Sequence, residues 1–152
     1  MTAYTSFHRN LHNSIRTQVA GIDWDYSEDP QGDPGGPPTV LYDNDGRDQP
    51  SDDRCWVNVS IRPNDSRQIA MGDGTRYFRH SGILVFQVYQ RLGTGTASSA
   101  FLCDRIASKF RGVTVSGVTY QTPVVGVMGN DDGGQWFKMN VRVPWYSDDS
   151  ET

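Results

Sequence analysis

Two stretches of the chain place apolar residues at every third or fourth position, which is the spacing of one face of an α-helix. The first stretch ends at Gly21, and its apolar face is formed by Tyr4, Phe7, Leu11, Ile15 and Val19. The second runs from Thr96 to Phe110 and ends before Gly112, with its apolar stripe at Leu102, Ile106 and Phe110. Thr and Ser residues ahead of it can cap its N-terminus. The pattern therefore predicts two amphipathic helices.

Alternation of apolar and polar residues predicts strands between and after these helices. Trp56 to Ile61 alternates clearly, and Pro63 with Asn64 is expected to end that strand. Gly72-Asp73-Gly74 predicts a turn into a long strand from Arg76 to Arg91. Its centre, Ile83 to Tyr89, is apolar on both faces apart from Gln87, which is typical of a strand in the middle of a sheet.

Shorter strands are predicted at Ile22–Tyr26, Val40–Tyr42, Val113–Tyr120 and Val124–Met128. Residues 130–134 form a turn-rich run that leads into a last strand, Trp136 to Trp145. That strand has an inward face of Phe137, Met139, Val141 and Val143. Its opposite face carries Lys138, Asn140 and Arg142.

Two segments lack any periodicity. Ser27 to Pro38, rich in Pro, Gly and acidic residues, predicts a surface loop, and the acidic Ser147 to Thr152 predicts a disordered tail. With 152 residues and no internal repeat, the whole chain, 1–152, is expected to form a single domain. The predicted fold is α+β, a largely antiparallel β-sheet packed by two α-helices.

The composition is that of a soluble globular protein: 36% of residues are hydrophobic, and the net charge is only −4. The absence of a secretory signal pattern at the N-terminus predicts a protein made in a reducing cytoplasm. Cys55 and Cys103 are far apart and sit beside apolar residues, which favours buried free thiols over a disulfide or a metal pair.

Motifs for catalysis or for a cofactor are weak. His8 and His12 have the spacing of two metal ligands, but the glutamate of HExxH is missing and no third ligand is evident. The Gly93–Thr96 turn lacks the lysine of a phosphate-binding loop. The acids in 43–54 fall at the wrong offsets for a calcium loop, and no GxSxG motif is present. We therefore predict no catalytic residue, no cofactor and no metal.

Acidic residues are concentrated in one part of the chain. Ten of the eighteen lie between Asp23 and Asp53, where Arg47 is the single basic residue. The second half of this run carries Asp43, Asp45, Asp48, Asp52 and Asp53. It is either a solvated loop or a wall of a pore or interface that repels DNA phosphates. Basic residues are dispersed, which disfavours tight DNA binding.

An ordered set of motifs in the second half of the chain resembles the phage tail terminator family. It comprises Tyr77-Phe78-Arg79-His80-Ser81-Gly82-Ile83-Leu84-Val85-Phe86-Gln87-Val88, then Gly93-Thr94-Gly95, then Lys109-Phe110-Arg111-Gly112, and finally Asn140-Val141-Arg142-Val143-Pro144-Trp145. The resemblance extends more weakly upstream to Tyr42-Asp43-Asn44 and to Trp56–Arg62, so it covers Val40 to Tyr146.

This resemblance implies a structural virion protein at the junction of phage tail and neck, assembled in the host bacterial cytoplasm. Such a subunit forms a homohexameric ring on the tail tube protein, ends tube polymerisation and presents a surface to a head completion (stopper) protein. DNA would pass through the ring without specific binding, and no membrane is involved. Two other hypotheses stay open: another neck or minor tail protein, and a small ligand-binding protein.

The outward face of the last strand is the candidate contact surface of such a ring. Trp136, Lys138 and Arg142 could contact a neighbouring subunit there, and the alternative is ordinary solvent exposure or packing within the domain.

Overall fold

The computed structural model describes residues 3–25, 38–43, 55–93, 96–130 and 133–151. The two helices are α1 (Ala3–Ala20) and α2 (Ala97–Phe110). The strands are β1 (Thr39–Tyr42), β2 (Trp56–Gly72), β3 (Thr75–Arg91), β4 (Thr114–Val115), β5 (Val118–Tyr120), β6 (Val124–Asn130) and β7 (Trp136–Glu151). Strands contain more residues than helices, so the fold is predominantly β.

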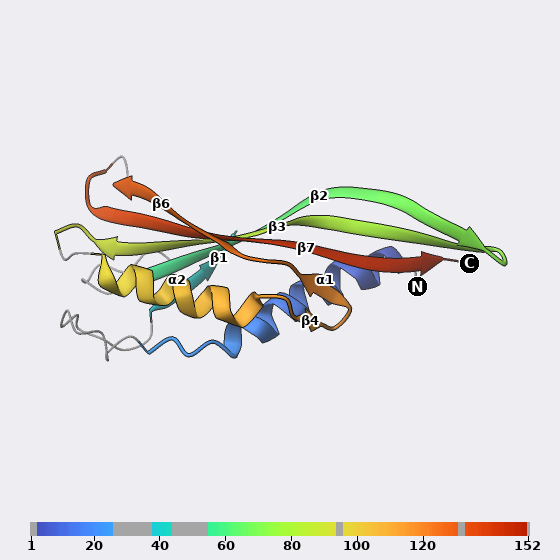
Figure 1. Cartoon of the computed structure of the whole chain (residues 1–152), viewed down its shortest axis with the longest axis horizontal. Helices are drawn as coiled ribbons and strands as arrows, with labels where there is room; N and C mark the ends of the chain where they lie inside the picture. The colour runs from blue at the N-terminus through green and yellow to red at the C-terminus, as the bar shows by residue number, and fades with distance from the viewer. Residues whose placement is uncertain (1–2, 26–37, 44–54, 94–95, 131–132, 152) are drawn as a thin grey trace.

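The strands form one sheet in the order β1-β2-β3-β7-β5-β4, with β6 pairing with another part of β7. β1 is parallel to β2, and every other pair is antiparallel. Both helices lie against the same face of this long, twisted sheet (Figure 1). The predicted antiparallel sheet packed by two helices is thus confirmed, and the central place predicted for Ile83–Tyr89 is confirmed by β3, which lies between β2 and β7.

The core fills the space between the helices and the inner face of the sheet. α1 contributes Phe7, Leu11, Ile15 and Val19, as the three-and-four spacing predicted. α2 contributes Leu102, Ile106 and Phe110, and the sheet contributes alternate residues of β2, β3 and β7. Burial of this apolar surface is the main stabilising contribution to the subunit.

The turn at Gly72-Asp73-Gly74 is confirmed and has a defined conformation. Asp73 (φ 51°) and Gly74 (φ 77°) are the two residues between β2 and β3. Positive φ at both positions is the pattern of a type I′ turn, which matches the twist of a hairpin. Ser116 (φ 53°) and Gly117 (φ 82°) repeat it between β4 and β5, so the predicted strand Val113–Tyr120 is in fact a small hairpin.

The prediction that Pro63 and Asn64 end the second strand was wrong. β2 continues to Gly72, with one register shift between Pro63 and Asp65 and another between Gln68 and Ala70. A proline cannot donate a ladder hydrogen bond, but it is tolerated at a bulge or where its side of the strand is unpaired. Within the described residues, β2 beyond Arg62 pairs only with β3. The result is a long hairpin that projects past the helices (Figure 1).

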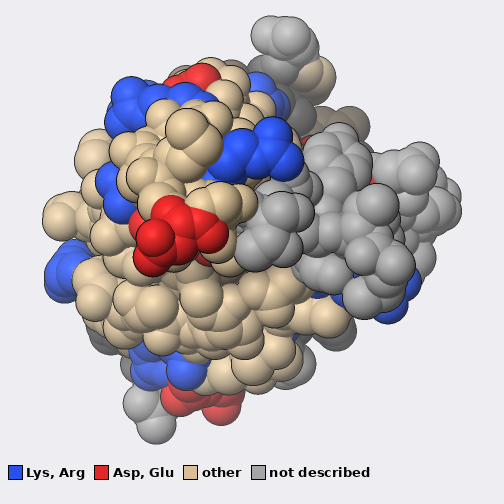
Figure 2. Space-filling model, turned by 90° about the vertical axis from the view of Figure 1, so that its right-hand side faces the viewer, with Lys and Arg blue, Asp and Glu red and all other residues tan. Residues whose placement is uncertain are grey.

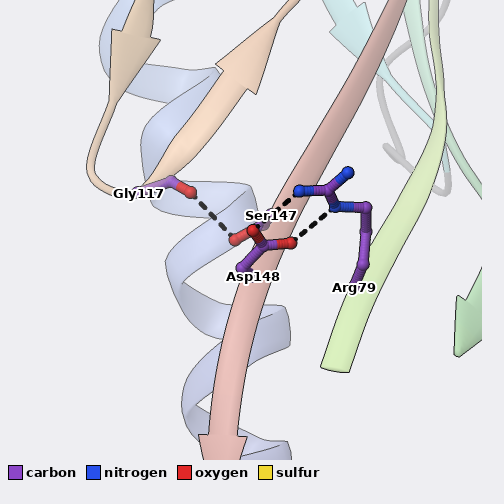
Figure 3. A network of polar contacts seen from close by, with 4 residues as sticks. All are labelled: Arg79, Gly117, Ser147 and Asp148. Atoms are coloured by element: carbon purple, nitrogen blue, oxygen red, sulfur yellow. Dashed lines mark hydrogen bonds and ion pairs between the residues drawn. The ribbon is translucent and has the colours of Figure 1, made fainter. Parts of the chain in front are cut away.

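The prediction of a disordered tail over 147–152 was also wrong for the described part of that segment. β7 runs to Glu151 and pairs with β3 as far as Arg76. Ser147 Oγ donates a hydrogen bond to the Gly117 carbonyl (3.0 Å), and Arg79 binds Asp148 (Figure 3). An acidic sequence is ordered here because the facing strand supplies backbone partners and a cation.

Two smaller expectations changed. Residues 22–25 form no strand, although Ile22 is buried in the core. Thr96 is the N-cap residue of α2, but it makes no side-chain capping bond. Instead, the Ser99 amide donates to Gln90 Oε1 (2.9 Å), so a buried glutamine on β3 caps the helix. The predicted loop 27–37 lies outside the described residues, and Pro38 is buried.

Candidate assembly surfaces

The face of the sheet turned away from the helices, here called the outer face, carries the candidate contact residues of β7. Lys138, Asn140 and Arg142 alternate with the buried Met139, Val141 and Val143, as predicted. Lys138 and Asn140 are half-buried, and Arg142 is exposed. The placement of these polar residues away from the core is therefore confirmed, while their contact with another subunit stays a prediction.

Trp136 is not available as an exposed contact residue. Its side chain is 1% exposed and packs with Trp56 and Leu41 in a second small cluster, which Tyr89 borders. The Trp56 and Tyr89 rings stack at 3.9 Å, and Trp136 meets Trp56 edge-on at 6.2 Å. Trp136 therefore packs within its own subunit, which is the alternative that the sequence left open. The sequence did not reveal that aromatic residues from three strands cover this end of the outer face.

A shallow hollow of about 360 Å³ lies at the middle of the outer face. Ile83 and Val85 of β3 contribute apolar lining between two cationic side chains, Arg62 of β2 and Arg142 of β7. Neither arginine has an ion-pair or side-chain hydrogen-bond partner among the described residues. Two guanidinium groups beside exposed apolar surface suit contact with another macromolecule better than catalysis.

The projecting hairpin and the end of β7 form a three-stranded arm, comprising Arg62–Gly72, Thr75–Gly82 and Trp145–Glu151. At its base, Phe7 of α1 stacks on His80 with ring centroids 4.0 Å apart. Further out, Arg79 binds Asp148 through two hydrogen bonds of 2.8 and 3.0 Å, and these bonds lower the pKa of the Asp148 carboxyl. The arm is thus held together by cross-strand contacts and by one helix.

The arm ends in exposed apolar side chains. Ile69, Met71 and Tyr77 are 43%, 70% and 43% exposed. At the opposite end of the sheet, β6 exposes four more: Val124, Val125, Val127 and Met128. Sequence reasoning did not single out these residues as contact candidates. Sheet edges usually carry charged residues, and neither Gln68–Gly72 nor Val124–Asn130 has one. That absence of charge could have identified these two segments from the sequence.

Of the acidic candidates, the structure describes Asp43 alone. It follows β1, and its Oδ1 accepts a hydrogen bond from Ser60 Oγ (2.9 Å). Asp45, Asp48, Asp52 and Asp53 lie outside the described residues, so their place beside a pore or an interface stays a prediction. Seen from the arm end, basic and acidic side chains are scattered among neutral ones rather than gathered in one basic patch (Figure 2).

His12 lies beside a small hollow of about 90 Å³ that Arg16, Tyr42 and Asp43 also line. The Arg16 guanidinium sits 4.0 Å from the centroid of the Tyr42 ring. Burial lowers the pKa of His12, and the nearby Arg16 lowers it further. A cation in this hollow would meet Arg16, so the geometry disfavours a metal there. The described residues contain no cluster of three or more metal-ligating side chains.

The two cysteines are free and buried, as predicted. Burial, and to a smaller extent the neighbouring Asp104, raises the pKa of the Cys103 thiol to about 12. A thiol with so high a pKa is a poor nucleophile. Within the part of the chain that is described, no helix is long and apolar enough to cross a membrane.

Comparison with known proteins gives a family and a fold. Seven chains of solved structures match. One of them aligns over 95% of this chain and 96% of its own length, with a TM-score of 0.56 and 13% sequence identity, which indicates a shared fold only. No curated protein matches. Residues 33–145 match the family described as phage tail terminator protein, close to the span of the resemblance noted in the sequence. Since that match covers most of the chain, the protein belongs to the phage tail terminator family.

Proposed function

We propose that this chain assembles as a homohexameric ring on the end of the tail tube, stops tube polymerisation and provides the surface on which the head docks. The family membership carries the proposal, because tail terminators are structural components of the virion and are not known as enzymes. Ring assembly needs surfaces for a neighbouring copy, for the tube protein and for a head completion protein. It needs no reaction centre.

Three features of the subunit support an assembly role. The outer face has an exposed centre around Ile83, and its two arginines have no side-chain partner among the described residues. The arm extends past the helices (Figure 1) and ends in the exposed apolar side chains of Ile69, Met71 and Tyr77. β6 is an exposed apolar strand at the other end of the sheet. An elongated sheet with separate exposed patches offers several contact surfaces to different neighbours.

Passage of DNA without specific binding is part of the same proposal. The chain has a net charge of −4, and its cations are not gathered into a stripe on the face seen in Figure 2. A low density of positive charge weakens phosphate contacts, which supply most of the non-specific affinity for DNA. Where the acidic residues between Asp43 and Asp53 face the lumen, they would further repel the phosphates.

The test is electron microscopy of particles made by the phage when this gene is deleted, compared with particles made after complementation in trans. Overlong tubes without heads are the expected result. Tails of normal length that fail to join heads would instead assign the chain to the alternative role of a neck or minor tail protein, such as a head completion protein. Intact infectious particles would contradict both roles.

A further inference from the structure

Two strand segments at opposite ends of the sheet are uncharged and expose apolar side chains. One is Gln68–Gly72 at the end of the arm, where Met71 is 70% exposed. The other is β6, Val124–Asn130, where Val127 is 69% exposed. In Figure 1 the end of the arm and β6 lie at the two extremes of the molecule.

Both segments also have a strand partner on one side alone in the described part of the chain. Within the described residues, β6 pairs only with β7, and Gln68–Gly72 pairs only with β3. Natural proteins usually protect such edges with charged residues, and the earlier part of the arm on β2 follows this rule, with Arg62, Asp65 and Arg67. On β2 itself the charges stop at Arg67, where the exposed apolar residues begin. The nearest charges beyond them are Asp73 in the turn and Arg76, which lies opposite Met71 on β3. An uncharged apolar edge is typical of a surface that another chain covers.

We propose that the end of the arm of one copy packs against β6 of the next copy in the ring. This inference rests on the ring proposed above and names the contact that joins its subunits. Because the two patches lie at opposite ends of one chain, each copy can offer its arm to one neighbour and its β6 to the other. Such a head-to-tail contact, repeated around an axis, closes a ring rather than stopping at a dimer.

A second copy of this chain fits these two segments better than an unrelated protein does, because the segments match each other in polarity. Neither edge segment carries a charged side chain of its own, so packing one against the other takes no charge of either segment out of water. A separate partner would cover one patch and leave the second exposed in every subunit. Mutual coverage removes Ile69, Met71 and Val127 from water at one contact.

The test is disulfide trapping in assembled particles. The two native cysteines are 1% and 0% exposed, so introduced thiols dominate the reaction. We expect the double variant Met71→Cys/Val127→Cys to give, on mild oxidation, a ladder of covalent multimers up to the ring. Met71→Cys or Val127→Cys alone should remain monomeric, while a mixture of the two single variants should give dimers. The matched control is Met71→Cys/Ser108→Cys, because Ser108 is exposed on α2 and belongs to neither patch.

The outcomes separate this contact from the proposed function. Normal tails containing the chain but no ladder would overturn the contact and leave the terminator role intact. Dimers from Met71→Cys alone would overturn it too, because they require arm-to-arm packing. A photo-crosslinking residue at position 71 should capture a second copy of this chain; capture of the tube protein would assign the arm to the tube. Absence of the chain from particles would instead contradict the proposed function.

A charge placed at the contact gives an independent readout. Met71→Asp/Val127→Asp should fold normally, since both side chains are more than two-thirds exposed. It should fail to complement the deletion and should yield overlong tubes, whereas Ser108→Asp should complement fully. Full complementation by Met71→Asp/Val127→Asp would contradict the inference.

Discussion

Ser14 Oγ lies 2.7 Å from the Tyr120 hydroxyl, which joins α1 to β5 across 106 residues of sequence. The same Ser14 hydroxyl donates to the Val115 carbonyl (2.8 Å), so Tyr120 is the donor to Ser14. Ser14 and Tyr120 are fully buried. Ser14→Ala would leave the tyrosine hydroxyl and a carbonyl without their partner, and we expect a loss of about 1–3 kcal/mol in the free energy of unfolding.

Tyr120→Phe should cost less than Ser14→Ala, because Ser14 keeps the Val115 carbonyl as its acceptor. Urea denaturation of the two single variants and of the double variant measures the coupling between the hydroxyls. Strictly additive losses would show that the hydroxyls do not interact.

Gly82 is expected to tolerate no side chain. A Cβ atom there would lie 2.6 Å from Cζ2 of Trp145 and closer still to the Arg62 carbonyl oxygen. Gly82→Ala should therefore lower the free energy of unfolding by about 1–3 kcal/mol through overpacking. Gly72→Ala is the matched control, since nothing lies within 4 Å of a Cβ at that position. Equal stability of the two variants would show that β3 shifts freely at Gly82.

The Arg79–Asp148 pair predicts a pH dependence of arm stability. Its hydrogen bonds lower the pKa of Asp148 from the ordinary 3.8, so the folded state favours the carboxylate. The stabilisation is present above that ordinary pKa and is lost as the pH falls through the lower, folded value. Both side chains are partly exposed, so solvent screens the pair and its contribution to stability is small.

The test compares Asp148→Asn with the unsubstituted chain by urea denaturation. The difference in unfolding free energy should be present near neutral pH and should shrink in acid. Asp104→Asn, which alters an exposed acid on α2, is the control. A difference that is the same at both pH values would rule out the ion pair as its source.

Cys103 should react with a thiol reagent only when the subunit unfolds. At pH 8 a thiol with a pKa of about 12 is almost entirely protonated, and the side chain is also inaccessible. We expect negligible labelling of the native chain, two labelled cysteines in denaturant, and rapid labelling of one cysteine in native Met71→Cys. Fast modification of the native unsubstituted chain would reveal local opening around α2.

Much of the fold was predictable because it follows from periodicity. The core faces of α1, α2 and the centre of β7 are set by side-chain spacing that one face of a helix or strand must satisfy. The Asp73-Gly74 turn was predictable from its own two residues, because Asp and Gly both tolerate the positive φ that the turn requires.

Other features depend on partners far away in sequence and could not be predicted. β2 passes through Pro63 because β3 pairs with it on one side. Ser147–Glu151 forms a strand because β3 lies beside it. The acidic sequence of that segment does not indicate which strand it pairs with. The burial of Trp136 could not be predicted because alternation gives the face of a strand but not what covers that face. Trp56 covers it from another strand.

β7 is flanked on one side by β3 and on the other by β5 and β6, so it pairs with more strands than any other described strand. It is also the last of the described strands along the chain. A nascent chain can therefore form the β2–β3 hairpin early, but β3, β5 and β6 acquire their common partner only after β7 has been made. Because β6 pairs with β7, the edge that we assign to the neighbouring copy matures only after β7 has been made. The order of synthesis thus discourages half-made subunits from joining a growing particle.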